Sequence, residues 1–132
     1  MPIQVEVFHP NRFILAVVRG SVTIEEYQTF LVDMVKAGIL HYRKLIDITS
    51  ATPSAEGRAA LLAIDARLRS HGDKIPRGPL AIVVDVERTE NAQEFKSATS
   101  ADRPMEFFFS IHAARRWLNA QPVIEPPPKP GG

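Results

Sequence analysis

Apolar and polar residues alternate along the first segment of the chain, 3–8. Ile3, Val5 and Val7 fall on one face and the residues between them are polar, which is the period-two pattern of a half-buried strand. The next segment, 13–18, is apolar on both faces and predicts a more central strand. The residues between the two segments read His-Pro-Asn-Arg and have turn chemistry. The pattern therefore predicts an antiparallel hairpin.

A helical repeat of apolar residues follows the hairpin, from Ile24 to about Ala37. Thr23 lies three residues before Glu26, which is the spacing of a capping box, in which each side chain bonds the backbone amide of the other residue. Gly38 is placed to end the helix as its C-cap. The spacing therefore predicts a helix over 24–37.

Short apolar runs alternate with helical segments through the rest of the chain. Alternation of this kind after a hairpin indicates a mostly parallel sheet with right-handed crossovers and helices covering it. We therefore predict an α/β fold, with an N-terminal β-hairpin that leads into a mixed, mostly parallel five-stranded sheet with about four helices. The further strands are expected at 45–48, 80–84 and 105–109, and the further helices between a cap at Thr52 or Ser54 and Gly72, over 89–99, and after a cap at Ser110.

The chain of 132 residues has the length of one ordinary domain. We expect this domain to occupy residues 1–120. The remaining residues, 121–132, are rich in proline, which removes amide donors and blocks helix formation. They predict a flexible, extended tail, which contains Pro127 and Pro130 at the spacing of a polyproline-II ligand.

Charge and composition narrow the function classes. The 16 Lys and Arg residues nearly balance the 15 Asp and Glu residues, which argues against nucleic acid as a partner. Cysteine is absent, so disulfides, thiol catalysis and cysteine-bearing metal sites are excluded. No apolar run approaches the roughly 20 residues that a membrane span needs, and the N-terminus does not resemble a signal peptide. We expect a cytoplasmic protein with no integral membrane association.

Three stretches carry a resemblance to a known family. They are Val17–Tyr27, with a strand, a glycine and a Thr-led acidic helix start; Lys44–Ile48, with a strand and an aspartate before a polar segment; and Phe107–Leu118, with a closing strand and an Ala-x-x-Trp-Leu helix. Their order resembles the STAS-like family, which is related in fold to the bacterial anti-sigma-factor antagonists and more distantly to the CRAL-TRIO lipid-binding domains. The resemblance covers residues 3 to about 120.

The resemblance implies a non-enzymatic regulatory or protein-binding role. In the anti-sigma-factor antagonists, a partner kinase phosphorylates a serine at the start of the helix after the third strand, within Asp-Ser-Ser-Gly or a similar signature. This chain reads Ser54-Ala55-Glu56-Gly57 there and lacks the acidic residue before the serine. Ser54 is therefore the positional candidate for the modification.

Hydroxyl side chains gather in the segment that follows the third predicted strand. They could hold an anion at the start of the next helix, where an arginine is also near, or they could cap the free amides of that helix. We expect the partner-binding or phosphorylated surface here. The candidate residues are Thr49, Ser50, Thr52, Ser54 and Arg58.

Two aspartates, Asp47 and Asp85, lie at or near the carboxyl ends of predicted parallel strands, beyond which open α/β sheets bind their ligands. Together with Arg88 they are candidate ligand-binding residues. Their carboxylates could hold a hard cation such as magnesium, or they could cap loop and helix amides. The four histidines have no metal-site spacing, and we predict no metal site and no cofactor.

Three consecutive aromatic residues, Phe107, Phe108 and Phe109, fall in the last predicted strand. Neighbouring strand residues face opposite ways, so all three belong to the core if helices cover both faces of the sheet. They could instead line an apolar pocket for a lipid-like molecule. The function that we expect is a non-enzymatic STAS-like domain that binds another protein, with a homodimer as a further expectation. The alternative is a carrier or sensor of a small apolar or anionic ligand.

Overall fold

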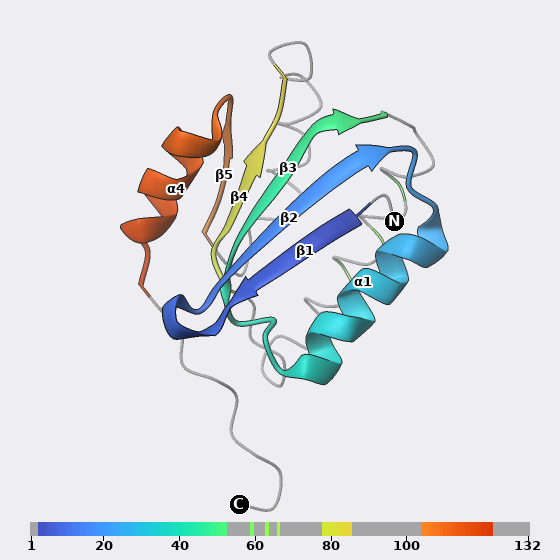
Figure 1. The fold of residues 1–132 in the computed structure, drawn as a ribbon, viewed down its shortest axis with the longest axis horizontal. Helices are drawn as coiled ribbons and strands as arrows, with labels where there is room; N and C mark the ends of the chain where they lie inside the picture. Colours follow the sequence, from blue (N-terminus) through green and yellow to red (C-terminus); the bar gives the residue numbers. More distant parts are fainter. Residues whose placement is uncertain are drawn as a thin grey trace, which may run out of the picture.

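A computed structural model describes residues 3–52, 78–85 and 104–122, together with Ala59, Ala63 and Ala66. A five-stranded sheet runs through the described part, with the strand order β1-β2-β3-β4-β5 (Figure 1). β1 and β2 pair in antiparallel fashion, and the remaining neighbours are parallel. The mixed, mostly parallel five-stranded sheet expected from the sequence is confirmed. Its strands are β1 (Ile3–Phe8), β2 (Phe13–Gly20), β3 (Arg43–Ala51), β4 (Leu80–Val83) and β5 (Met105–Phe108).

The strands β1 and β2 form the expected hairpin. A short 3-10 turn, η1 (His9–Asn11), joins them. Arg12 ends the turn with a left-handed φ of 50° and donates its backbone N–H to the His9 carbonyl. The His9 ring forms a hydrogen bond with the buried Tyr42, whose hydroxyl lies 2.8 Å from His9 Nδ1.

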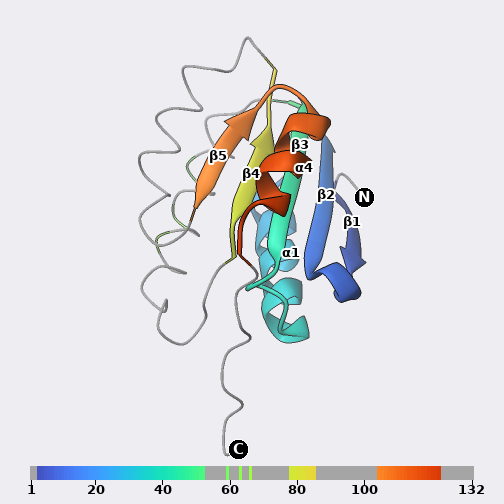
Figure 2. The same ribbon diagram turned by 90° about the vertical axis from the view of Figure 1, so that its left-hand side faces the viewer.

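Helices lie on both faces of the sheet. Figure 2 shows α4 (Ile111–Asn119) in front of the strands and α1 (Ile24–Ala37) behind them. The limits of α1 are those predicted from the sequence, and its capping box between Thr23 and Glu26 is present. Gly38 ends the helix in the left-handed conformation, with φ of 69°, which costs glycine little because it has no side chain.

The core consists of apolar layers on the two faces of the sheet. On the α4 face, residues of α4 pack on β2, β3 and β4; on the α1 face, one cluster joins α1 to β2 and another covers β4 and β5. The alternation of faces along each strand produces this division. The α4-face cluster contains Phe13, Leu45, Ala81, Val83, Ala114 and Leu118; the α1-face clusters contain Ile14, Met34, Ile39, Leu40 and Tyr42, and Leu80, Ile82, Val84 and Met105.

The last helix begins where the sequence predicts, with the Ser110 hydroxyl accepting the Ala113 amide at 3.1 Å. Ala114 and Leu118 of α4 are fully buried. Ile111 is 42% exposed. It is the first residue of α4, so it lies at the end of the helix rather than over the middle of the sheet.

Two further helices were expected between the later strands. The segments 53–77 and 86–103 lie outside the described residues, except that Ala59, Ala63 and Ala66 are helical. The part of the chain that the structure describes therefore contains two complete α-helices, α1 and α4. The expected tail also lies outside it from residue 123 onward.

Candidate functional site at the carboxyl end of β3

The third strand is longer than the sequence predicts. It was expected to end at Ile48 and to give way to a loop, but β3 continues to Ala51. Thr49 and Ser50 are therefore strand residues, and the prediction of a loop at these two positions is wrong. The extension is possible because β2 is also long and supplies backbone partners, with Arg19 opposite Ser50 and Gly20 opposite Ala51.

The extension of β3 projects beyond its other neighbour. The pairing of β4 with β3 reaches only as far as Asp47, which lies opposite Val83. Beyond Asp47, the recorded strand pairing of β3 is with β2 alone. We call residues 48–52 the β3 extension. Figure 1 shows it leading away from the end of β4.

A β-bulge lies at the base of the β3 extension. Val17 pairs with Asp47 and Arg19 pairs with Ser50, so β3 contains one residue more than β2 over this interval. Bulges bend a strand and re-aim its side chains, and they are frequent beside functional sites. Sequence reasoning missed this bulge, because it depends on the register between two segments about 30 residues apart in the chain.

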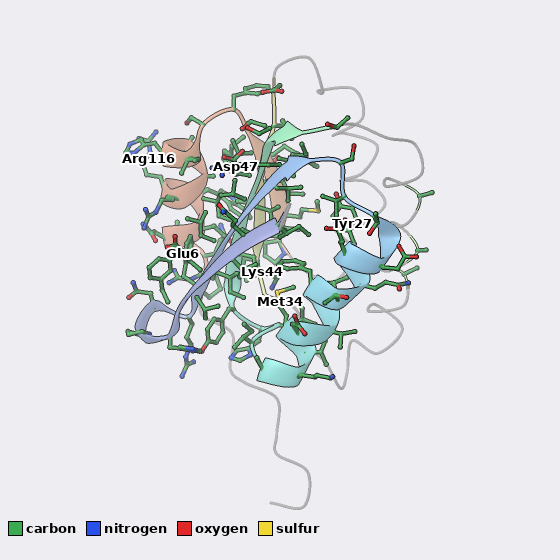
Figure 3. All side chains as sticks on the ribbon, turned by 45° about the vertical axis from the view of Figure 1, so that its right-hand side comes forward. Glu6, Tyr27, Met34, Lys44, Asp47 and Arg116 are labelled. Atoms are coloured by element: carbon green, nitrogen blue, oxygen red, sulfur yellow. The ribbon has the colours of Figure 1, made fainter. Side chains whose placement is uncertain are left out.

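The Asp47 carboxylate braces the bulge. Its Oδ1 accepts the Thr49 backbone N–H at 2.9 Å and the Thr49 hydroxyl at 2.7 Å. One carboxylate oxygen thus satisfies a backbone donor and a side-chain donor of the same residue. Asp47 faces the same side of the sheet as Leu45, two residues earlier, which packs in the α4-face cluster. Figure 3 shows Asp47 on the α4 side and Met34 on the α1 side.

The end of the β3 extension is also held in place. Thr52 donates its backbone N–H to the Gly20 carbonyl at 2.8 Å, and Gly20 adopts a left-handed φ of 66° that a residue with a side chain would rarely adopt. Ser50 and Thr52 are exposed and Thr49 is half-buried. Three of the five candidate residues of the hydroxyl-rich segment therefore lie in the β3 extension, and two of them are exposed. Ser54 and Arg58 lie outside the described residues.

The structure describes only two of the three candidate ligand-binding residues, Asp47 and Asp85. Asp85 is half-buried and follows the end of β4, two residues beyond the partner of Asp47. Arg88 lies outside the described residues. Within residues 3–52, 78–85 and 104–122, no group of three or more His, Cys, Asp or Glu side chains is arranged to hold a metal ion. Of the two roles considered for Asp47, the structure records the bonding of a nearby amide.

The aromatic run in β5 divides between core and surface. Phe108 packs against Trp117 of α4 with ring centroids 5.7 Å apart, and Phe107 joins the α1-face cluster over β4 and β5. Phe109, just after the strand, is 59% exposed. Ile111, two residues later, is also a large apolar residue that is exposed. The sequence left Phe109 open between the core and an apolar pocket; β5 stops at Phe108, and Phe109 lies beyond it.

Among the helices that the structure describes, none has the length and apolar character needed to cross a membrane.

A solved structure shares this fold. It is an uncharacterized protein of the DUF3478 family with a SpoIIAA-like fold, from Shewanella loihica PV-4. The two chains are 25% identical, with a TM-score of 0.59, and the match covers 88% of this chain and 91% of the other. Comparison with protein-family models gives no match, and a search of curated proteins gives none either. The resemblance to the STAS-like family is confirmed at the level of the fold.

Proposed function

We propose that this STAS-like domain binds another protein through the β3 extension and the segment that follows it, and that it does so without catalysing a reaction. The observation that carries the proposal is the braced geometry of the β3 extension. Its bulge is fixed by Asp47, and its far end is fixed by the bond from Thr52 to Gly20. A polar segment that is already ordered loses little conformational entropy when a partner binds it.

The position of the extension also supports a regulatory role. Ser54 follows Thr52 by two residues, so a phosphate on Ser54 would lie next to the proposed surface. A phosphate adds about two negative charges and strong hydrogen-bond acceptors, which would change the fit of a partner without altering the sheet. We propose that such a switch operates in the cytoplasm, the location that the sequence predicts.

Binding accounts for the chemistry of Asp47 better than catalysis does. A general base must reach the proton that it removes from a substrate. The Oδ1 of Asp47 instead accepts both donors of Thr49, which fixes the backbone of the bulge. We therefore assign Asp47 a structural role that shapes the binding surface.

A second function, a carrier or sensor of a small apolar ligand, is favoured by one observation. Phe109 and Ile111 are large apolar side chains that are exposed at the carboxyl end of the sheet. Exposed apolar side chains in this position could contact an apolar ligand. Phe107 and Phe108 already pack within the core and contribute less to this alternative.

Two variants with the same new side chain test the first proposal. Ser50→Arg places a long cation on the exposed β3 extension, and Gln28→Arg places it on the exposed surface of α1. Tagged wild-type protein and both variants are used to capture partners from the source cells. We expect one protein to be captured by wild type and Gln28→Arg and to lose at least about tenfold in affinity for Ser50→Arg, a change of about 1.4 kcal/mol. Equal capture by all three proteins would contradict the proposal.

Native mass spectrometry of the protein purified from its own host separates the two functions. An added phosphate that is absent from Ser54→Ala would support the switch, and Ser54→Asp should then alter the affinity for the captured partner. A non-covalent small molecule that is lost from a Phe109→Ser variant, with no protein partner, would replace the proposal by the carrier function.

A further inference from the structure

Among residues 3–52, 78–85 and 104–122, no strand pairs with the outer backbone edge of β1. β1 pairs with β2 along its whole length, from Ile3 to Phe8, and ends the strand order of the sheet. Figure 1 shows it in front of the other strands, with α4 on one side and α1 on the other. We propose that two copies of this chain pair through antiparallel β1 strands, with a two-fold axis at Val5, and so join two five-stranded sheets into one.

The β1 edge lacks common devices that prevent such pairing. Edge strands are usually protected by bulges, prolines, several charges or a covering element. The register between β1 and β2 has no shift, and residues 3–8 contain no proline and a single charged residue, Glu6. Gln4, Val5 and Glu6 are all exposed, Val5 to 40%. The edge is therefore regular, accessible and suited to a second strand.

The side chains favour one register of the pair. In an antiparallel pair, opposed residues face the same side of the sheet. The two-fold axis of the dimer therefore lies midway between the two copies of one residue, and we name each register by that residue. An axis at Glu6 would oppose two carboxylates, which is destabilising. An axis at Gln4 would leave Glu6 and Val7 without partners in the second strand. An axis at Val5 opposes Val5 to Val5 and Ile3 to Val7, which extends the apolar row across the junction.

The register at Val5 is also complementary in charge. It places Glu6 of the second copy opposite Gln4, on the face where Arg19 lies. Arg19 Nη1 donates to Gln4 Oε1 at 3.3 Å, so the amide NH₂ of Gln4 is oriented away from Arg19 and can donate to the incoming carboxylate. The guanidinium of Arg19 then lies near the same carboxylate. By symmetry this arrangement occurs twice in the dimer.

A ladder of this length buries little surface, so the dimer should be reversible and depend on concentration. It is independent of the β3 extension, because β2 separates β1 from β3. The proposed partner surface and the proposed dimer edge can therefore be tested separately.

Single cysteines give a direct test, because the chain has none of its own. Directly opposed residues in an antiparallel pair have Cα atoms about 4.5–5.5 Å apart, which a disulfide can span. We expect Val5→Cys to form a disulfide-linked dimer under mild oxidation at a protein concentration that leaves Glu6→Cys and Val32→Cys monomeric. Val32 is the matched control, an exposed valine on α1. The double variant Gln4→Cys/Glu6→Cys should also crosslink, because the register opposes these two positions.

Sedimentation of the cysteine-free protein provides a second measurement. Wild type should dimerise as its concentration rises, and Glu6→Lys should weaken the dimer by about tenfold or more, because it places a lysine beside Arg19 of the other copy. Circular dichroism confirms that the exposed substitution leaves the fold intact. Monomeric wild type at all concentrations, equal crosslinking at Val5 and Val32, or crosslinking of Glu6→Cys alone would each overturn the proposal.

Discussion

Lys44 is a charged residue that belongs to the interior of the molecule. Its side chain is 3% exposed, and its Nζ donates to the carbonyls of Leu40 at 2.6 Å and Tyr42 at 2.9 Å. Those carbonyls lie in the turn between α1 and β3, and the Leu40 carbonyl also accepts the Gly78 backbone N–H at 3.1 Å. The ammonium group thus fixes the turn that positions the start of β3 (Figure 3).

Because Lys44 has this role, we expect removal of its charge to lower the free energy of unfolding. Lys44→Met keeps the apolar stem but removes the charged donor from both carbonyls, and only the Leu40 carbonyl keeps another donor, the Gly78 N–H. We therefore expect the free energy of unfolding to fall by about 1–3 kcal/mol. Lys36→Met is the matched control on the exposed last turn of α1 and should cost less than about 1 kcal/mol. Urea unfolding of the two variants measures the difference. Equal stability would show that Lys44 does not support the turn.

At the scale of elements, the sequence predicts best what is local. The capping box at the start of α1 joins residues three positions apart, and both of its hydrogen bonds are present, at 3.0 Å and 3.1 Å. The Ser110 cap of α4 is equally local. The length of β3 is not local, because its last residues are strand only through their pairing with β2. The sequence therefore did not predict that Thr49 and Ser50, two of the candidate site residues, are strand residues.

The capping box carries a stability prediction of its own. Thr23→Ala removes the acceptor of the Glu26 amide and leaves that amide to solvent, so we expect a loss of about 1 kcal/mol. Ser21→Ala, an exposed hydroxyl just before the cap, should change stability by less than about 0.5 kcal/mol. Thermal unfolding of both variants tests the pair. A larger loss for Ser21→Ala would mean that another residue caps α1.

At the scale of the whole molecule, the strand order follows the chain, and this explains the placement of the helices. Successive parallel strands added in one direction by right-handed crossovers put their connections on one face. α1 is such a connection, between β2 and β3, and lies on the face opposite α4. The sequence predicted parallel pairing from alternation, but not the order of strands, because alternation is the same in every arrangement of a parallel sheet.

The placement of α4 leads to a prediction for the whole fold. Leu118 is fully buried, and it packs in the α4-face cluster of the sheet. Leu118→Ala should lower the free energy of unfolding by about 3 kcal/mol, from lost burial and the cavity that remains. Ile111→Ala, also an aliphatic truncation in α4 but at a position 42% exposed, should cost less than about 1.5 kcal/mol.

Urea unfolding followed by Trp117 fluorescence reports on both variants, because this single tryptophan packs on Phe108 between α4 and the sheet. If α4 closes this face of the core, the Leu118→Ala protein should also bind a dye for exposed apolar surface at urea concentrations where wild type does not, since a loosened α4 uncovers Phe13, Leu45 and Val83. The Ile111→Ala protein should bind no more dye than wild type. Equal losses in the two variants would mean that the end of α4 contributes as much to the core as its buried face does.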